Sequence, residues 1–347
     1  MRKLLVLLVI TVFFTAPVNA LEFSPPTTPP IAEKFMPEES ISFEKDLWYI
    51  VKEVLREVAP GISEAMSICA SVIAVQLFIS MVQSFNGIAK KTIHLTGIVA
   101  LSILLLKPSR ALISLGVETI QLISEYNKLL LPVMTAALAS QGGATMSAAL
   151  YAGTVMFDTL LSIMISKVIL PLLYAYIALG IAFAAIDEQV LGNLLGFIKW
   201  LVTWLLKIVI YVFTGYMGIT GVISGTVDAA ALKATKLAIS GTVPVIGNII
   251  SDASETILIG TGIVKNATGV YGILVILTLW LAPFLKIGIQ YLLLKITAGI
   301  VSFYSDKQAV SVVNHICTAM GFILAMTCTV CLLLLISVVC FMKGFSQ

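Results

Sequence analysis

The chain has 347 residues, of which 59% are hydrophobic and 11% are charged, with a mean hydropathy of +1.06 and a formal net charge of +3. Soluble globular domains carry roughly 25% charged residues. The composition therefore excludes a soluble globular protein and indicates a polytopic membrane protein. The sequence offers no basic patch that would bind nucleic acid.

The first segment is MRKLLVLLVITVFFTAPVNA, which has a basic start, an apolar run and small residues around Ala20. This order is typical of a secretory signal peptide, so residues 1–20 are predicted to be one. An uncleaved first transmembrane helix is the alternative. Residues 21–40 contain SPPTTPP and predict an extended, proline-rich extracytoplasmic linker.

Residues 41–60 are predicted to form an extracytoplasmic amphipathic helix. Apolar residues recur at helical spacing from Phe43 to Val58, and Lys and Glu fill the other face. Pro60 and Gly61 are expected to end this helix. It would lie on the outer membrane surface or against a partner, and residues 61–347 would form the multi-span transmembrane domain.

The predicted fold is all-α, with about seven transmembrane helices plus two re-entrant or interfacial segments. A full span needs about 20 apolar residues. The long apolar runs are Ile62–Phe85, Ala144–Ile165, Val168–Ile186, Phe197–Ile223, Gly269–Leu294 and Ile316–Met342. Thr92–Leu106 has only 15 residues between two pairs of basic residues, which favours a re-entrant or half-depth helix over a short tilted span.

Charged residues between the spans predict which side each connection faces. Lys90 and Lys91 are expected on the cytoplasmic side, following the positive-inside tendency. Asp187 and Glu188 are expected in an outer loop, and the chain is expected to end in the cytoplasm after Lys343.

Ala111–Leu131 carries a polar stripe on an otherwise apolar helix. Its polar residues recur at steps of four and three and share one face: Ser114, Glu118, Gln121, Glu125 and Lys128. Such a helix either lies in the membrane interface or lines a polar cavity. Pro132 is expected to bend the chain after it.

The stretch SGTVPVIGNIISDASETILIGTGIVKN, residues 240–266, is unsuited to lipid. Helix breaks are predicted at Pro244, Gly247, Gly260 and Gly262. Between and after them lie the polar residues Asn248, Asp252, Glu255, Lys265 and Asn266. A carboxylate at mid-bilayer costs about 2.5–3.5 kcal/mol. Three interpretations stay open, namely a hydrated surface loop, a re-entrant hairpin lining a polar cavity, and a buried ion pair of Asp252 with Lys265.

Four glycines recur at three- and four-residue steps and predict close helix packing: Gly215, Gly218, Gly221 and Gly225. The five cysteines lie in apolar surroundings and are read as small buried hydrophobes, including the C-x-x-C of Cys328 and Cys331. No nucleophile elbow, phosphate loop or HExxH motif is present. Asp158 and Asp252 lack the motif of an intramembrane protease. We expect no enzyme activity, no catalytic residue, no cofactor and no metal.

Three stretches resemble the stage III sporulation protein AE family of endospore-forming bacteria. They are FEKDLWYIVKEVLREV, LLLPVMTAALASQGGATMSAAL and VPVIGNIISDASETILIGTGIVKNATGVYGILVIL. The third is the most specific, and the similarity runs over nearly the whole mature chain. It covers Pro244, Gly247, Asp252, Lys265 and Asn266 and attaches no catalytic role to them.

The resemblance implies a permease-like or pore-lining subunit of the channel complex between mother cell and forespore. It places the protein in the mother-cell membrane facing the forespore. The implied partners are other stage III membrane proteins of the same operon, ring-forming proteins and a cytoplasmic ATPase. Apart from the resemblance, if several copies form an aqueous path lined by Asn248, Asp252 and Glu255, the carboxylates of Asp252 and Glu255 would make a ring, as in cation-selective pores. The alternatives are a secondary transporter of a small solute and a non-conducting membrane scaffold.

Overall fold

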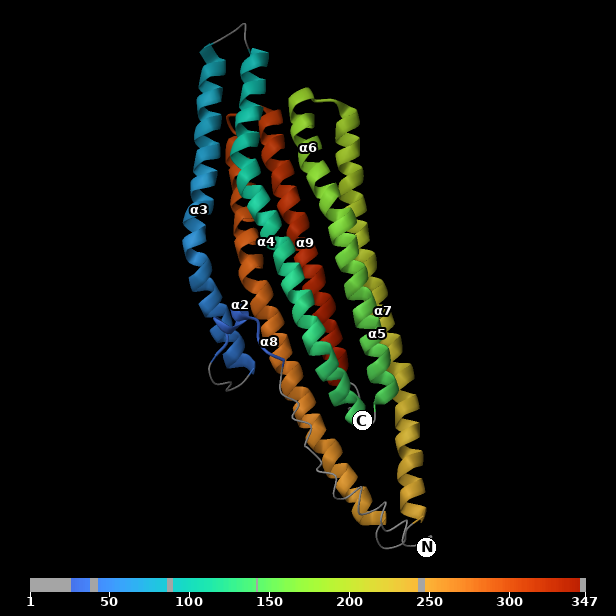
Figure 1. The fold of residues 1–347 in the computed structure, drawn as a ribbon. Helices are drawn as coiled ribbons and strands as arrows, with labels where there is room; N and C mark the ends of the chain where they lie inside the picture. The colour runs from blue at the N-terminus through green and yellow to red at the C-terminus, as the bar shows by residue number, and fades with distance from the viewer. Residues whose placement is uncertain (1–25, 38–42, 86–89, 142, 243–246, 344–347) are drawn as a thin grey trace.

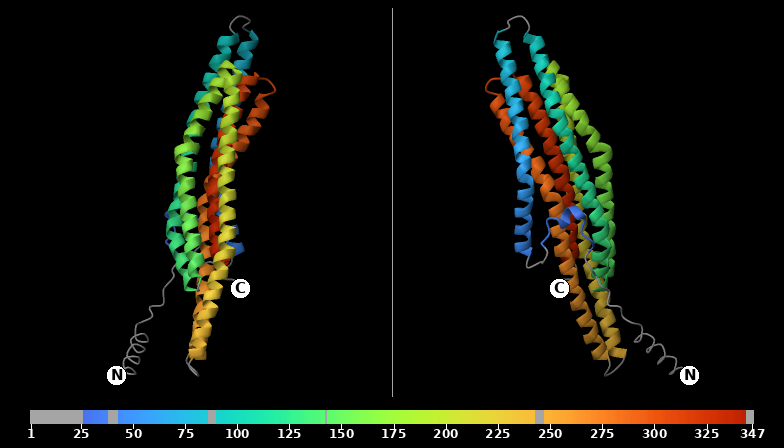
Figure 2. Two further views of the ribbon diagram at one scale, coloured as in Figure 1. Left: turned by 90° about the vertical axis from the view of Figure 1, so that its right-hand side faces the viewer. Right: turned by 60° about the vertical axis from the view of Figure 1, so that its left-hand side comes forward.

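A computed structural model describes residues 26–37, 43–85, 90–141, 143–242 and 247–343, and for residues 85, 90–91, 221–242 and 247–266 it describes the backbone alone. The predicted signal peptide and the first part of the predicted linker lie outside these residues. The described chain is all-α, as the sequence predicts. Its long helices run up and down beside one another in an elongated bundle (Figures 1 and 2).

The helices follow one another with short connections. Their bounds are α2 (Pro30–Glu33), α3 (Phe43–Phe85), α4 (Lys90–Ser140), α5 (Ala144–Met164), α6 (Leu170–Ile186), α7 (Gln189–Thr242), α8 (Gly247–Val301) and α9 (Lys307–Lys343). One π-helical turn, η1 (Ile165–Ile169), joins α5 to α6 without a break. Asp187 then ends α6 in the left-handed conformation, which Asp tolerates better than most residues.

The last helix, α9, forms the centre of the bundle. In its most apolar stretch 61% of the residues are buried, against 22–44% in the other long helices. Its core residues, from Val312 to Phe341, pack against side chains of α4, α6 and α8 within one large apolar cluster. The other helices therefore surround α9 and expose their outer faces.

Six of the described helices are long and apolar enough to cross a membrane, so the predicted count of seven is not confirmed. The predicted half-depth segment Thr92–Leu106 and the polar helix Ala111–Leu131 are one continuous helix, α4, which contains Pro108 and Pro132. The predicted spans Ala144–Ile165 and Val168–Ile186 are likewise one rod. A proline removes one backbone hydrogen bond, but ending a helix in an apolar bundle would leave several groups unpaired.

The amphipathic helix at residues 41–60 also continues past its predicted end. α3 runs through Pro60 to Phe85 as a single helix. The apolar face of its first part, with Ile50, Val54 and Val58, packs on Phe35 and on residues of α8 such as Leu274. The partner of this amphipathic face is thus α8 of the same chain, together with the segment after α2.

The connections divide between the two ends of the bundle. Three of them meet at one end, namely Phe85–Lys90, Ile186–Gln189 and Val301–Lys307 (Figure 1). A His94–Asp306 contact of 3.4 Å and a hydrogen bond from Gln308 to Asp187 tie this end together. The predicted cytoplasmic side for Lys90 and the predicted outer side for Asp187 therefore cannot both hold, because the two connections lie together.

The helices exceed the thickness of a bilayer. The six membrane-length helices contain 32 to 49 residues, which corresponds to about 48–74 Å at 1.5 Å per residue. The hydrocarbon core is about 30 Å thick, and an average tilt of about 20° adds little to the path. Part of each long helix therefore lies beyond the hydrocarbon layer.

Candidate functional site

The polar stripe of α4 lies on the outside of the bundle. All five of its members are exposed: Ser114, Glu118, Gln121, Glu125 and Lys128. The Ser114 hydroxyl donates a hydrogen bond of 2.8 Å to the Glu118 carboxylate. The stripe is therefore not turned into the interior of a single chain, and water, lipid headgroups or another protein must meet it.

The opposite face of α4 is held firmly against the central helix. Ile113, Ile120 and Ile123 are almost fully buried. Gly116 lies so close to Ile323 of α9 that a Cβ atom at this position would overlap its side chain. This close approach fixes the rotation of α4 about its axis and thereby directs the stripe outward.

The surface around the stripe at the same level is mostly apolar on the next two helices. Ser124 of α4 contacts α5 at Asp158, and α5 in turn packs on α7 through a Phe157–Phe213 ring contact. Close to these contacts, α5 and α7 expose the large apolar side chains Leu160, Ile163, Ile208, Tyr211 and Val212. Exposed polar residues also occur here, such as Lys207 of α7, but the carboxylates at this level are concentrated on α4.

A buried carboxylate lies directly behind the stripe. Asp158 of α5 is only 6% exposed and accepts a 3.0 Å hydrogen bond from the Ser124 hydroxyl. The Ser162 hydroxyl lies 3.5 Å from that of Ser124. One turn away along α5, the buried Thr154 hydroxyl pairs with Ser337 of α9. Intramembrane carboxylates that face a bundle interior commonly mark ion or substrate paths.

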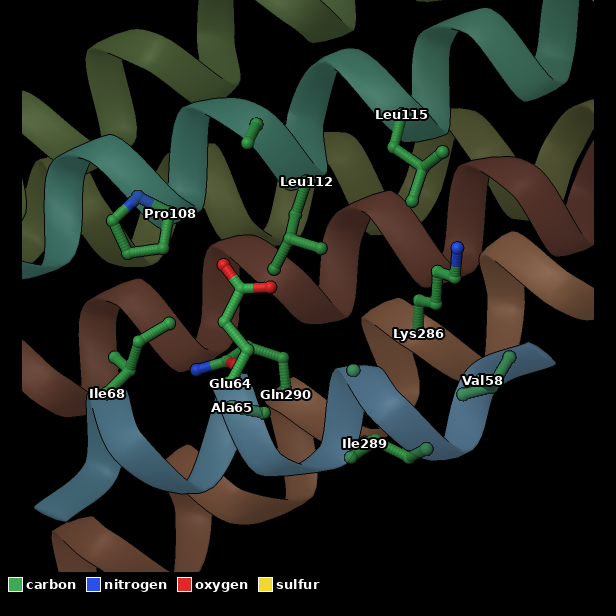
Figure 3. Close-up of a pocket in the computed structure, with 12 residues that line it drawn as sticks. Val58, Glu64, Ala65, Ile68, Pro108, Leu112, Leu115, Lys286, Ile289 and Gln290 are labelled. Carbon is green, nitrogen blue, oxygen red and sulfur yellow. The ribbon is translucent and has the colours of Figure 1, made fainter. Parts of the chain in front are cut away.

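A second polar region is a cavity of about 210 Å³ between α3, α4 and α8. Its wall is apolar apart from Glu64 of α3 and Lys286 and Gln290 of α8. Figure 3 shows these three side chains reaching into the space between the helices, opposite the α4 residues Pro108, Leu112 and Leu115.

The cavity coincides with prolines in each of its three helices. Pro60 of α3 directly precedes the lining residue Gly61, Pro108 of α4 lines the cavity itself, and Pro283 of α8 lies one turn before Lys286. Each proline leaves a carbonyl without its helical donor. These carbonyls belong to Arg56, Leu104 and Leu279, four residues before each proline, and none of the three residues lines the cavity.

The predicted polar segment at residues 240–266 lies mostly outside what can be described. α7 ends at Thr242 and α8 begins at Gly247, on either side of Pro244. α8 then continues through Gly260 and Gly262, so the second predicted break is wrong. A helical glycine costs only about 1 kcal/mol relative to Ala, which the long helix tolerates. The side chains of Asn248, Asp252, Glu255, Lys265 and Asn266 lie outside the described residues.

The predicted glycine packing face of α7 meets no neighbouring helix of the same chain where it can be described. A Cβ atom on Gly215 or Gly218 would have no atom within 4 Å, and the side-chain surroundings of Gly221 and Gly225 lie outside the described residues. Close helix contacts occur instead at Gly116, at Gly153 against Tyr216 and at Gly180 against His315.

Sequence reasoning missed the Asp158 cluster and the cavity. Asp158 was considered only as a protease residue, although it is the one carboxylate in the apolar run Ala144–Ile165 and that was a usable signal. Its companions Ser124 and Asn127 lie on another helix, so no spacing along the chain connects them. Glu64 and Lys286 of the cavity also lie on different helices, so no spacing along the chain connects them either.

Comparison with known proteins agrees with the resemblance found in the sequence. The model of the family "Stage III sporulation protein AE" matches residues 30–344. Stage III sporulation protein AE of Bacillus subtilis (strain 168) is 24% identical over 238 residues, which are 68% of this chain and 59% of that relative. The chain thus aligns with less than two thirds of the relative's length. No solved structure gives a significant match. The chain belongs to the stage III sporulation protein AE family.

Proposed function

We propose that this protein is a pore-lining or permease-like membrane subunit of the complex that joins mother cell and forespore during sporulation. The observation that carries the proposal is the exposed polar stripe of α4, which includes Glu118 and Glu125. The family gives the sporulation role, and the six membrane-length helices give the multi-pass membrane location. The proposed role requires no catalysis.

The physical argument concerns what can cover the stripe. Two carboxylates facing lipid on one helix would cost several kcal/mol, at about 2.5–3.5 kcal/mol each near the bilayer centre. The apolar faces of α5 and α7 at the same level suit lipid, whereas the α4 face suits water or a second subunit. Several copies with α4 turned inward would place Glu118 and Glu125 in rings around an aqueous path, as in cation-selective pores.

The proposed setting is the mother-cell membrane facing the forespore. Proposed partners are other stage III membrane proteins of the same operon, ring-forming proteins and a cytoplasmic ATPase. The exposed outer face of α7, with Gly215 and Gly218, offers a place where a second helix can approach closely. A homo-oligomer is therefore part of the proposal.

Cysteine accessibility tests the exposure of the stripe. The five native cysteines are first replaced. Single cysteines then go to Gln121 or Glu125 on the stripe, and to Ile163 on the apolar face as the matched control. A membrane-impermeant maleimide should label the two stripe positions and leave position 163 unlabelled. The proposal would be contradicted if positions 121 and 125 are not labelled and if, in addition, copies of the chain do not cross-link through these positions. In that case neither water nor a second subunit would meet the stripe.

Charge neutralisation tests whether the stripe matters for sporulation. The Glu118→Gln, Glu125→Gln double variant should accumulate normally, because exposed substitutions change stability by less than about 0.5 kcal/mol. It should lose spore formation in a host that the wild-type chain complements. The control replaces two exposed glutamates elsewhere, Glu44→Gln with Glu188→Gln, and should sporulate. Normal sporulation by the stripe variant would instead favour a non-conducting scaffold.

A further inference from the structure

We propose that Ser124 and Asn127 of α4, with Asp158 and Ser162 of α5, form a binding site for a sodium ion. The site lies inside the bundle, behind the polar stripe. It does not depend on the stripe lining a pore, because it is a property of one folded chain.

The four residues converge because of helical spacing on two adjacent helices. Ser124 and Asn127 are three residues apart and share a face of α4, and Asp158 and Ser162 are four apart and share a face of α5. The Ser124 hydroxyl lies 3.0 Å from a carboxylate oxygen of Asp158 and 3.5 Å from the Ser162 hydroxyl. The Asn127 side chain also interacts with the Asp158 carboxylate.

The cluster has oxygen atoms in excess and lacks a positive partner. Asn127 is 1% exposed, and its side-chain carbonyl oxygen has no hydrogen-bond donor. Within the described part of the chain, no Lys or Arg nitrogen lies within 4.0 Å of Asp158. Lys128, one turn along α4 from Ser124, acts on the carboxylate only through its longer-range field, and its own side chain is exposed.

The Asn127 oxygen has no donor, and leaving a buried acceptor unsatisfied costs about 1–3 kcal/mol. The Asp158 carboxylate has a donor in Ser124, but the described residues place no Lys or Arg nitrogen within 4.0 Å of it. A bound cation would balance this buried charge and could also accept the free amide oxygen as a ligand. Carboxylate, amide carbonyl and hydroxyl oxygens are the hard ligands that hard cations prefer.

Size and charge favour sodium. The Ser124 oxygen lies 3.0 Å from an Asp158 oxygen and 3.5 Å from the Ser162 oxygen. If such pairs are neighbouring ligands of an octahedral cation, the cation–oxygen distances are about 2.1–2.5 Å, which suits ions between Mg²⁺ and Ca²⁺ in size. Sodium falls in that range, whereas potassium needs a wider ring of oxygens. A divalent ion would leave one charge uncompensated beside a single buried carboxylate, which is strongly unfavourable in an apolar surrounding.

The site is also within reach of solvent. Ser162 is only half-buried, and the exposed residues Glu125 and Lys128 flank Ser124 on the same helix. An ion can therefore enter from the side of the stripe without opening the central packing around α9.

Thermal unfolding of the full chain in detergent tests the proposal. The melting temperature is followed while NaCl replaces choline chloride at constant ionic strength, with KCl as a parallel series. Sodium should raise the melting temperature saturably by about 2 °C or more, as expected for a ligand that binds only the folded state. Potassium should give a smaller rise at the same concentration. A wild-type chain that responds equally to all three salts would overturn the proposal.

Variants then locate the ion. Asp158→Asn should abolish the sodium response, and Ser162→Ala should shift its midpoint several-fold while the protein still folds. The matched control is Asp187→Asn, the same substitution at the far end of the α5–α6 rod, where Asn also tolerates the left-handed conformation. A sodium response that survives in both Asp158→Asn and Ser162→Ala would overturn the site. Stabilisation by acid alone, with no sodium effect, would do so too and would indicate a protonated Asp158.

Discussion

The upper and lower halves of α4 belong to one helix but face different surroundings. Near the end that carries the Phe85–Lys90 connection, the outward residues are apolar, and Leu95, Val99 and Ile103 are 37–69% exposed. Farther along, the outward residues are those of the stripe, including Glu118 and Glu125. Both halves contribute inward residues to the same large apolar cluster.

This difference shows that packing within the bundle determines the residues of the inner face, whereas the surrounding medium determines those of the outer face. The inner face is mainly apolar along the helix because it packs on α8 and α9, and it includes a few buried polar residues such as Ser109, Ser124 and Asn127. The outer face changes where the medium changes from lipid to water or protein. Three substitutions in α4 test this difference between its two halves.

The largest effect should come from placing a charge on the apolar outer half. Ile103→Asp puts a carboxylate where lipid is expected and should cost about 2.5–3.5 kcal/mol of insertion energy, seen as loss of protein from the membrane fraction. Gln121→Asp, the same residue placed on the stripe, should accumulate like the wild type. Equal membrane levels of the two variants would remove the contrast between the halves.

An intermediate effect is expected from a substitution at Gly116, where α4 lies closest to the central helix α9. Gly116→Leu would push α4 off Ile323 and should lower stability by about 1–3 kcal/mol through overpacking, measured as a lower melting temperature in detergent. Gly196→Leu is the control, since a Cβ atom there would have no atom within 4 Å. If Gly116→Leu melts like the wild type, then α4 is not held in its rotation by this contact.

The smallest effect should come from the hydrogen bond at the top of the stripe. Ser114→Ala removes the hydroxyl that donates to Glu118. Because both groups are exposed, the melting temperature should change by no more than the equivalent of about 0.5 kcal/mol. A larger loss would mean that Ser114 is buried against another subunit in the assembled protein.

The sequence predicted several features because they depend on local pattern. Apolar runs of membrane length predicted an all-α multi-span fold, and steps of four and three predicted the stripe. The helix breaks were predicted less well. Pro60 was expected to end a helix but lies inside a continuous one, because packed neighbours keep the helical hydrogen bonds on both sides of the proline. Gly215 and Gly218 predicted contacts that the described chain does not make.

By itself, the sequence determined the membrane class, the family and the residues that cannot face lipid, because hydropathy and helical periodicity are properties of a single segment. Only the tertiary structure decided that the stripe faces outward, that Asp158 meets Ser124 and Asn127, and that Glu64 and Lys286 share a cavity. Those facts depend on how each helix is rotated and which helix lies beside it. Close contacts such as Gly116 with Ile323 set that rotation, and they join residues too far apart in the chain to leave a periodic signal.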